Sequence, residues 1–188
     1  MDKKNELLAA AREVFAEKGY KAAGISDIAK RSQMAVGSFY KYYESKEAIF
    51  LEVYVAENSR IREEIMQRVD WHGEPEAIVE QLFAVTFELI SPNKILAEWN
   101  KPGISQILHD YYNQDSGRAS NAFHQFLIQT FSQRLQEEGF SKEKIAEIMK
   151  VYDLIYYIDM HVTEQEFSGY FDSLETLVKY FVKGIFSK

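Results

Sequence analysis

The stretch from residue 25 to residue 46, ISDIAKRSQMAVGSFYKYYESK, indicates how the N-terminal part of the chain folds. Ile28 and Ala29 share one face of a short helix, and residues 32–35 fit a tight turn with Met34 as its apolar member. Phe39 follows on a second short helix and can anchor it to the first. Because two short helices across a tight turn form a helix-turn-helix, we predict DNA binding.

The residues before this stretch predict a helix over 4–18. Its apolar positions recur every three or four residues, and Lys18-Gly19 is a typical helix end; the apolar positions are Leu7, Leu8, Ala11, Val14 and Phe15. We therefore expect three short helices that share one small core.

The second helix of the motif is too short to bury much surface, yet its polar side chains can donate hydrogen bonds to phosphates or base edges. These side chains are Ser38, Tyr40, Lys41 and Tyr42. Aromatic residues at this spacing could also simply be core. We expect Phe39 and Tyr43 to be buried, and Tyr40 and Tyr42 to face outward.

Ser45 can cap a fourth helix, with Glu47 in its first turn, where the helix dipole favours negative charge. Lys46 opposes that dipole and needs a compensating partner. A DNA phosphate would serve, although a single lysine is by default a solvated one.

Residues 5–52 resemble the DNA-binding domain of the tetracycline repressor (TetR) family. The resemblance rests on Ala10-Ala11, Val14-Phe15, Gly19-Tyr20, Asp27-Ile28-Ala29, Gly37-Ser38-Phe39-Tyr40 and Ser45-Lys46-Glu47. It implies an all-α fold, in which a three-helix DNA-binding head (residues 1–46) precedes a larger helical body (residues 47–188) that binds an effector and dimerises.

The resemblance also implies the DNA contacts. It assigns base contacts to Ser26, Val36, Gly37 and Ser38, and backbone or mixed contacts to Tyr40, Lys41, Tyr42 and Lys46. The chain departs from the family's usual Thr-Ser at Ala23-Gly24 and from its frequent Ser-Lys at Ala35-Val36. Both short helices therefore lack a hydroxyl cap, and Val36 could make only an apolar contact, such as with a thymine methyl.

Composition is that of an ordinary globular protein: 188 residues, 46% hydrophobic and 27% charged. No cysteine is present, which excludes disulfides and thiolate metal sites. The first residues resemble no signal peptide, and no apolar run approaches ~20 residues, so we expect a cytoplasmic protein without a membrane span.

The net charge of −7 by itself argues against nucleic acid binding, but the charge is unevenly distributed along the chain. Residues 1–50 have a net charge of +2 and residues 51–188 of −9. The acidic residues are concentrated in the body. A head of +2 still implies a local basic face and two heads that bind together.

The body shows helical periodicity and no strand alternation. We expect a helix over 45–69 and further helices over 75–90, 92–99, 102–113, 117–138, 142–163 and 173–186. Pro75, Pro92 and Pro102 each fit a first helical turn. Gly139 should end one helix, Ser141 should cap the next, and Asp172 with Glu175 should start the last.

The last two helices predict a homodimer. Residues 151–162 are apolar nearly all round, and the final helix has a regular apolar stripe. In the family that the chain resembles, these two helices and their symmetry mates form a four-helix interface. The predicted interface residues are Leu154, Ile158, Val162, Leu174, Leu177, Val178, Phe181 and Ile185. The alternative is that both helices only complete one subunit's core.

Twenty aromatic residues follow residue 50. Such residues are usually core, but those with apolar bodies and polar tips also suit a ligand pocket. The predicted effector-binding residues are Trp99, His109, Tyr112, His124, Tyr152, Asp153, Tyr156 and Tyr157. Because the body is acidic and aromatic, we expect a flat aromatic effector, cationic or neutral, with Asp153 rather than Asp159 in the pocket. Asp153 could instead only hydrogen-bond to tyrosines.

Catalytic motifs and phosphate-binding glycine loops are missing from the sequence, and its four histidines lack metal-ligand spacing. We expect no enzyme activity, no cofactor and no metal. The Glu63-Glu64 and Glu137-Glu138 pairs, with Arg60, Arg62 and Arg134 nearby, fit solvated helix faces.

The predicted function is a ligand-responsive repressor that binds a palindromic DNA operator as a homodimer and is released by a small organic effector. One alternative is an effector-independent DNA-organising or partner-binding protein with the same head. Another is an all-α enzyme with an appended head.

Overall fold

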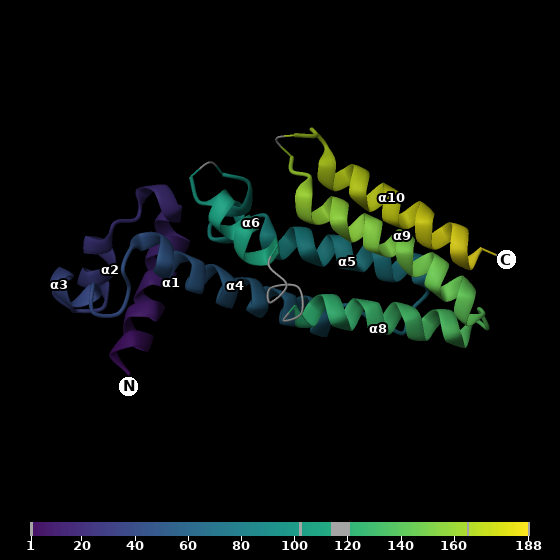
Figure 1. Cartoon of the computed structure of the whole chain (residues 1–188), viewed down its shortest axis with the longest axis horizontal. Coiled ribbons are helices and arrows are strands. Elements are labelled where there is room, and N and C mark those ends of the chain that lie inside the picture. The colour runs from purple at the N-terminus through teal and green to yellow at the C-terminus, as the bar shows by residue number, and fades with distance from the viewer. Residues whose placement is uncertain (1, 102, 114–120, 165, 188) are drawn as a thin grey trace. The chain divides into compact units, whose positions relative to one another are not determined.

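The computed structural model describes residues 2–101, 103–113, 121–164 and 166–187. These residues form helices joined by turns and short loops, and no strand occurs among them (Figure 1). The all-α prediction is confirmed. The elements are α1 (Lys3–Ala22), α2 (Ile25–Arg31), α3 (Val36–Phe39), α4 (Lys46–Arg68), α5 (Pro75–Ile90), η1 (Leu96–Asn100), α6 (Ser105–Asn113), α8 (Ala122–Glu137), α9 (Lys142–His161) and α10 (Tyr170–Phe186).

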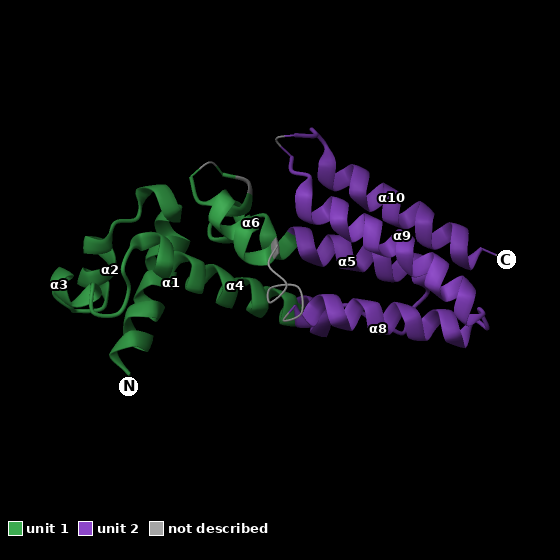
Figure 2. Ribbon diagram, viewed as in Figure 1, with its two compact units in different colours: residues 1–64, 88–118 green, residues 65–87, 119–188 purple. Residues whose placement is uncertain are grey.

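The chain divides into two compact units (Figure 2). Unit 1 comprises residues 1–64 and 88–118, and unit 2 comprises residues 65–87 and 119–188. Helices α4 and α5 each contribute residues to both units. Residues 46–64 of α4 belong to unit 1 together with the head, so this division into units differs from a boundary between residues 46 and 47. The boundary between a DNA-binding part and an effector-binding part stays a prediction.

The core of unit 1 is formed by α1, α2, α3 and the start of α4. Phe15, Phe39 and Phe50 have no exposed surface, and the rings of Phe15 and Phe50 meet edge to face with centroids 4.8 Å apart. Edge-to-face packing of fully buried rings is a favourable aromatic arrangement. The three-helix head is therefore built on the apolar positions from which it was predicted.

The other part of unit 1 is the segment from Asn93 to α6. Ile95, Leu96, Ile104 and Leu108 are all buried. The predicted helix over 92–99 is wrong: a turn is followed by the 3-10 helix η1. Asn93 causes this difference, because its Oδ1 accepts hydrogen bonds from the backbone N–H groups of Ile95 and Leu96 (3.0 and 3.1 Å).

Unit 2 has its buried core between α5 and α10. Val79, Phe83, Leu174 and Val182 form this core, and α9 adds Ile155 at its border. Helices α5 and α10 run antiparallel. Glu76 near the start of α5 pairs with Lys183 near the end of α10, and the ring centroids of Phe87 and Phe171, near the opposite ends, lie 5.9 Å apart.

Several helix ends agree with the sequence-based expectations. Pro75 begins α5, and Ser141 caps α9 by accepting a hydrogen bond from the Lys144 N–H (3.2 Å). Gly139 follows α8 with a φ of +82°, a conformation that favours glycine. Gly19, with φ of +73°, interrupts α1 as predicted, although three more helical residues follow it.

The predicted start of the last helix is wrong. Helix α10 begins at Tyr170 after Gly169, which has a φ of +77°, so Asp172 and Glu175 do not form the predicted cap. The predicted helix starts at residues 102 and 117 lie outside the described residues. Among the described helices, none is both long and apolar enough to cross a membrane.

Candidate functional site

Helix α3 is held by its aromatic residues. Phe39 is fully buried and Tyr43 is 6% exposed, whereas Tyr40 is 57% and Tyr42 38% exposed. The chain after α3 continues in helical turns, because the N–H groups of Tyr42 and Tyr43 both donate to the Phe39 carbonyl (2.9 and 3.1 Å). The predicted burial of these four aromatic residues is confirmed. Two aromatic rings are therefore displayed on the surface by two others that are anchored below them.

The remaining predicted DNA-contacting residues of this region are also accessible. Val36 is 45% exposed, Gly37 and Lys41 are exposed, and Ser38 is half-buried. An added Cβ at Gly37 would meet no atom within 4 Å, so a partner can approach the backbone closely there. Val36 begins α3 after Ala35, which offers no side-chain cap, as the sequence indicated.

Ser26 is exposed at the start of α2. No side chain caps α2, but Asp27 in its first turn reaches back to Gly24, since its Oδ2 accepts a hydrogen bond from the Gly24 N–H (3.0 Å). Lys18 pairs with the other oxygen at 2.8 Å, and the hydrogen bonds from Lys18 and Gly24 lower the pKa of Asp27. The first turn of α2 is thus fixed without the family's usual hydroxyl residues.

Lys46 has a partner within the chain. Its Nζ donates to the carbonyls of Tyr20 (3.0 Å) and Ala23 (3.1 Å) and lies 4.2 Å from the centroid of the Tyr20 ring. The carbonyls just after the Gly19 break supply the compensation that the sequence-based interpretation assigned to a phosphate. Lys46 therefore positions the link between α1 and α2.

Lys46→Met tests this internal role. We expect it to lower the free energy of unfolding by about 1 kcal/mol, because the variant cannot make the two charge-assisted hydrogen bonds of this half-exposed group. It should weaken DNA binding without changing how steeply affinity falls with salt. Fluorescence-detected DNA titrations at several salt concentrations measure this. A flatter salt dependence is expected when a contact to a phosphate is removed. That result would contradict the internal role and would support a direct contact between Lys46 and DNA.

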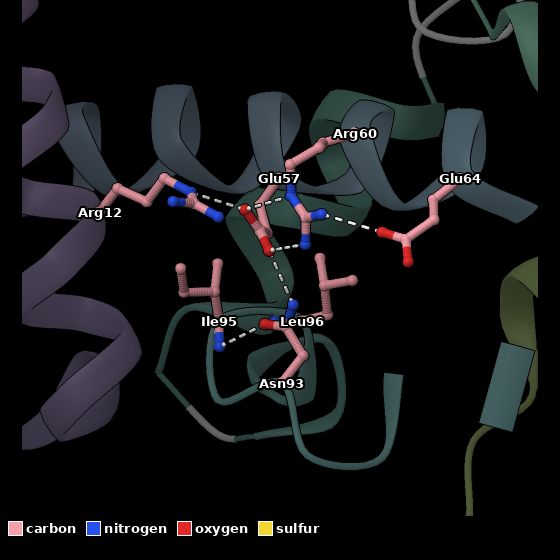
Figure 3. A network of polar contacts seen from close by, with 7 residues as sticks. All are labelled: Arg12, Glu57, Arg60, Glu64, Asn93, Ile95 and Leu96. Atoms are coloured by element: carbon pink, nitrogen blue, oxygen red, sulfur yellow. Dashed lines mark hydrogen bonds and ion pairs between the residues drawn. The ribbon is translucent and has the colours of Figure 1, made fainter. Parts of the chain in front are cut away.

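A buried carboxylate joins α1, α4 and the segment after α5 within unit 1 (Figure 3). Glu57 is 3% exposed, and its oxygens accept hydrogen bonds from Arg12 (2.7 Å), Arg60 (2.8 Å) and Asn93 (2.9 Å). Burial opposes ionisation, but the hydrogen bonds from Arg60, Arg12 and Asn93 outweigh it and lower the pKa of Glu57 to about 2. Glu57 is therefore ionised wherever the protein is folded at neutral pH.

A second buried carboxylate, Glu98 of η1, lies at the end of α1. Its Oε1 accepts from the Tyr20 N–H (3.2 Å) and from Lys101 (3.1 Å). Lys94 donates to the Glu17 carbonyl at 2.7 Å. The segment 93–101 thus binds the C-terminal part of α1 at two points. Sequence reasoning missed Glu57 and Glu98, because neither lies in a recognisable motif.

The predicted effector-binding residues fall into two groups. Trp99, His109 and Tyr112 lie in unit 1, where the rings of Trp99 and His109 stack with centroids 4.1 Å apart. The others lie in unit 2, where the His124 ring stacks on Tyr156 at 3.8 Å. The members of that second group are His124, Tyr152, Asp153, Tyr156 and Tyr157.

Unit 2 contains a cavity of about 270 Å³ between α5, α8, α9 and α10. Tyr152 and Tyr156 line it, but Asp153 and Tyr157 are exposed and do not. Of the two acids, Asp153 was expected in the pocket, but it is Asp159 that lines this cavity. Asp153 lies outside the lining because the helical repeat that turns Tyr152 and Tyr156 inward turns position 153 outward.

The predicted dimer residues fall into two groups, those that pack inside the subunit and those that remain at least partly exposed. Leu174 is buried, while Val178 and Phe181 pack against the core of unit 2, so these three serve the subunit itself. Leu154 and Leu177 are exposed, and Ile158, Val162 and Ile185 are partly buried. Further exposed apolar residues on the same two helices are Val151, Tyr157 and Tyr180. Exposed apolar residues therefore occur on both α9 and α10, and they differ in part from the predicted set.

No group of three or more His, Cys, Asp or Glu side chains suited to a metal ion occurs among the described residues. Two of the charged residues that were expected on solvated helix faces have other contacts. Arg60 forms an ion pair with Glu57, and Arg134 lines the cavity of unit 2. Arg62 donates to Asn58 at 3.1 Å.

Residues 7–53 match the family described as "Bacterial regulatory proteins, tetR family". The uncharacterised HTH-type transcriptional regulator YdgC of Bacillus subtilis is 39% identical over 62 residues, which are 33% of this chain and 32% of that protein. The HTH-type transcriptional regulator QacR of Staphylococcus aureus is 34% identical over 64 residues, 34% of each chain. The matched part thus spans about a third of these curated relatives.

The whole fold also has solved counterparts. A crystal structure of a proposed transcriptional regulator from Rhodococcus sp. RHA1 superposes with a TM-score of 0.58, covering 97% of this chain and 96% of the other. Sequence identity is 17%, so this likeness concerns the fold alone.

Proposed function

Because this chain belongs to the tetR family of bacterial regulatory proteins, we propose that it is a transcriptional regulator that represses its target genes until a small organic effector releases it from DNA. The observation that carries the proposal is the surface of α3 and the turn after it. Tyr40 and Tyr42 remain accessible beside Lys41, although aromatic side chains are normally buried when a fold has room for them. Tyrosine hydroxyls and a lysine ammonium are suitable donors to DNA phosphates.

The proposed DNA-contacting set is Ser26, Val36, Gly37, Ser38, Tyr40, Lys41 and Tyr42. Lys46 is retained as a positioning residue because its ammonium is bonded to the Tyr20 and Ala23 carbonyls. With a net charge of only +2 over residues 1–50, a single head should bind DNA weakly. Tight binding then requires two heads on half-sites about one helical turn apart.

We propose that a second copy of the chain covers the exposed stripe of α9 and α10. The stripe comprises Val151, Leu154, Tyr157, Leu177 and Tyr180, of which Tyr180 is 70% and Leu154 58% exposed. Large apolar side chains that recur along two helices form the kind of surface that a symmetric helical interface buries. The acidic body makes DNA an unsuitable partner for this surface.

The effector is proposed to bind in the cavity of unit 2. Helix α4 begins at Lys46, which fixes the end of the head, and ends at Arg68 in unit 2. Helix α5 lines the cavity and leads directly to Asn93, which binds Glu57. A shift of α4 and α5 on effector binding would therefore act on α1 through Glu57 and change the separation of the two α3 helices. Such a regulator works beside the chromosome, in the cytoplasm.

The proposal is tested by selecting DNA duplexes from a random pool with the purified full-length protein, and by titrating the selected duplex and the DNA flanking its gene. We expect a palindromic site and release of this site by an effector. Binding that no compound from a chemically diverse library alters would favour the effector-independent DNA organiser. Failure to prefer any duplex over random DNA would contradict the proposed regulator.

Two substitutions on α3 and the turn after it should have different effects on DNA binding. Lys41→Ala should weaken binding to all duplexes similarly and flatten the slope of log K against log salt by about 0.9 for each phosphate that the variant no longer neutralises. Ser38→Ala should alter the preference among related sites instead. Gel-shift titrations with matched and mismatched duplexes at several salt concentrations measure both. If neither variant differs from wild type, α3 does not face the DNA in this way.

A further inference from the structure

The cavity of unit 2 has an almost entirely apolar wall. Its lining runs along α10 from Phe171 to Phe186, which are 15 residues apart, or about 22 Å of helix. A space lined over that length suits an extended molecule. The apolar lining includes Val79, Leu82, Phe83, Leu127, Phe131, Ile155, Leu174, Val178, Phe181 and Val182.

Two charged side chains reach this cavity, Arg134 and Asp159. They belong to opposite ends. Arg134 lies one turn after Phe131, whose ring is 6.3 Å from that of Phe186 at the end of α10. Asp159 accepts a hydrogen bond from the hydroxyl of Tyr170, the first residue of α10 (3.3 Å). A molecule in the cavity can therefore meet a cation at one end and an anion at the other.

Arg134 lacks a hydrogen-bond acceptor at one of its donors. Its Nε is buried and has no hydrogen-bond partner, the one such side-chain atom among the described residues. The Glu138 carboxylate lies 3.7 Å from this Nε, close enough to balance charge but too far for a hydrogen bond. A buried N–H without an acceptor is costly and rare in folded proteins. An acceptor supplied by a bound molecule would satisfy it.

Asp159 offers less to a ligand. It is exposed, and the Tyr170 hydroxyl already donates to it. Solvent therefore screens its charge, and its attraction for a cationic group is weakened. The two ends of the cavity are unequal, and the end that holds a buried N–H without an acceptor is the cationic one. This asymmetry opposes the cationic effector that the acidic, aromatic body predicts.

We propose that the cavity binds an elongated, mainly apolar molecule with one anionic, carboxylate-like head that Arg134 holds. The guanidinium presents its N–H groups in a planar fork that matches a carboxylate, and an apolar surrounding strengthens such a charge-assisted bond. The proposal deepens the proposed function and rests on it only in naming this molecule as the effector. Binding itself can be tested without DNA.

The test compares three probes with the same ten-carbon chain: decanoate, decan-1-ol and decyltrimethylammonium. Isothermal titration calorimetry of the full-length protein measures each affinity. We expect decanoate to bind at least about tenfold more tightly than the other two, because only its head combines a negative charge with acceptors for Arg134. Decanoate should also release the selected DNA duplex in a gel shift.

Substitutions separate the head group from the chain. Arg134→Met keeps a long apolar side chain, and it should reduce decanoate affinity about tenfold or more while decanol affinity stays within about twofold. Arg134→Lys keeps the charge without the fork, and it should recover only part of the affinity. Glu138→Gln should strengthen decanoate binding, since it removes the competing carboxylate. Gln133→Met, on the exposed side of the same helix, should change nothing.

Three results would overturn the proposal: tighter binding of decyltrimethylammonium that Asp159→Asn abolishes, equal affinity of wild type and a folded Arg134→Met for decanoate, or binding of none of the probes. Thermal denaturation followed by circular dichroism establishes that each variant folds. Specific DNA binding measured without any probe is independent of these outcomes. Its loss would contradict the proposed regulator, whereas its persistence with no response to decanoate would contradict only the ligand.

Discussion

Leu154→Lys is expected to convert the dimer into a monomer and to reduce affinity for a palindromic site by about 10²- to 10⁴-fold. Leu154 is 58% exposed on α9 and lies on the stripe that we assign to the second copy. A lysine there would place a charge in the middle of an apolar interface, opposite its own symmetry mate or the mate's apolar side chains. The monomer itself should stay folded, because the side chain does not contribute to the buried core.

Sedimentation velocity at micromolar concentration measures the change in mass, and a gel shift measures the change in affinity. Gln133→Lys is the matched control, since it adds the same charge at an exposed position of α8 where Glu137 can pair with it. This control should remain a dimer with unchanged affinity. A wild-type protein that sediments as a folded monomer would contradict the assigned interface.

Phe181 illustrates why the sequence alone misplaced part of this interface. The apolar positions of α10 cover more than one face of the helix, and periodicity shows that a face is apolar without showing what covers it. Leu174, Val178 and Phe181 turn toward α5 and the cavity, whereas Leu177 turns outward. A charge at position 181 would therefore disturb the subunit itself and would not report on association.

The head was predictable because its determinants are local. Phe39, the Gly19 break and the Ser45 cap act on residues within a few turns, so the sequence pattern contains the information that positions them. The exposed or buried state of the four aromatics after Gly37 follows from the same short-range repeat. The head is therefore the part of the structure that agrees best with the sequence-based expectation.

The charged groups of the interior were not predictable in this way. Glu57 and its partners Arg12 and Asn93 are 45 and 36 residues apart in the sequence, and only the tertiary fold brings them together. Arg134 stands beside acidic residues, a pattern that is typical of a solvated helix face. It lines the cavity together with aromatic residues of α10, whose orientation the sequence does not give.

Glu57→Gln is expected to lower the free energy of unfolding by about 2 to 3 kcal/mol at pH 7, because a carboxylate with a pKa of about 2 is stabilised in the folded state relative to its ordinary value of 4.5. The glutamine keeps the size of the side chain and can still accept from Asn93, but it lacks the charge that Arg12 and Arg60 share. Urea denaturation of both proteins measures the difference.

The pH dependence of that difference identifies the charge as its source. A lowered pKa gives stability that is fully present above the ordinary value of 4.5 and is lost as the pH falls through the folded-state value of about 2. The gap between wild type and Glu57→Gln should therefore be constant from pH 7 to about 5.5 and should shrink steadily below pH 4.5.

Glu64→Gln provides the matched control, since Glu64 pairs with the same Arg60 (3.0 Å) on an exposed part of α4. Its effect should stay below about 0.5 kcal/mol, because solvent screens an exposed pair. A similar small effect for Glu57→Gln, or a gap that does not narrow in acid, would mean that Glu57 does not hold α1 to the segment after α5. The route proposed here from the cavity to the head would then have to run through α4 alone.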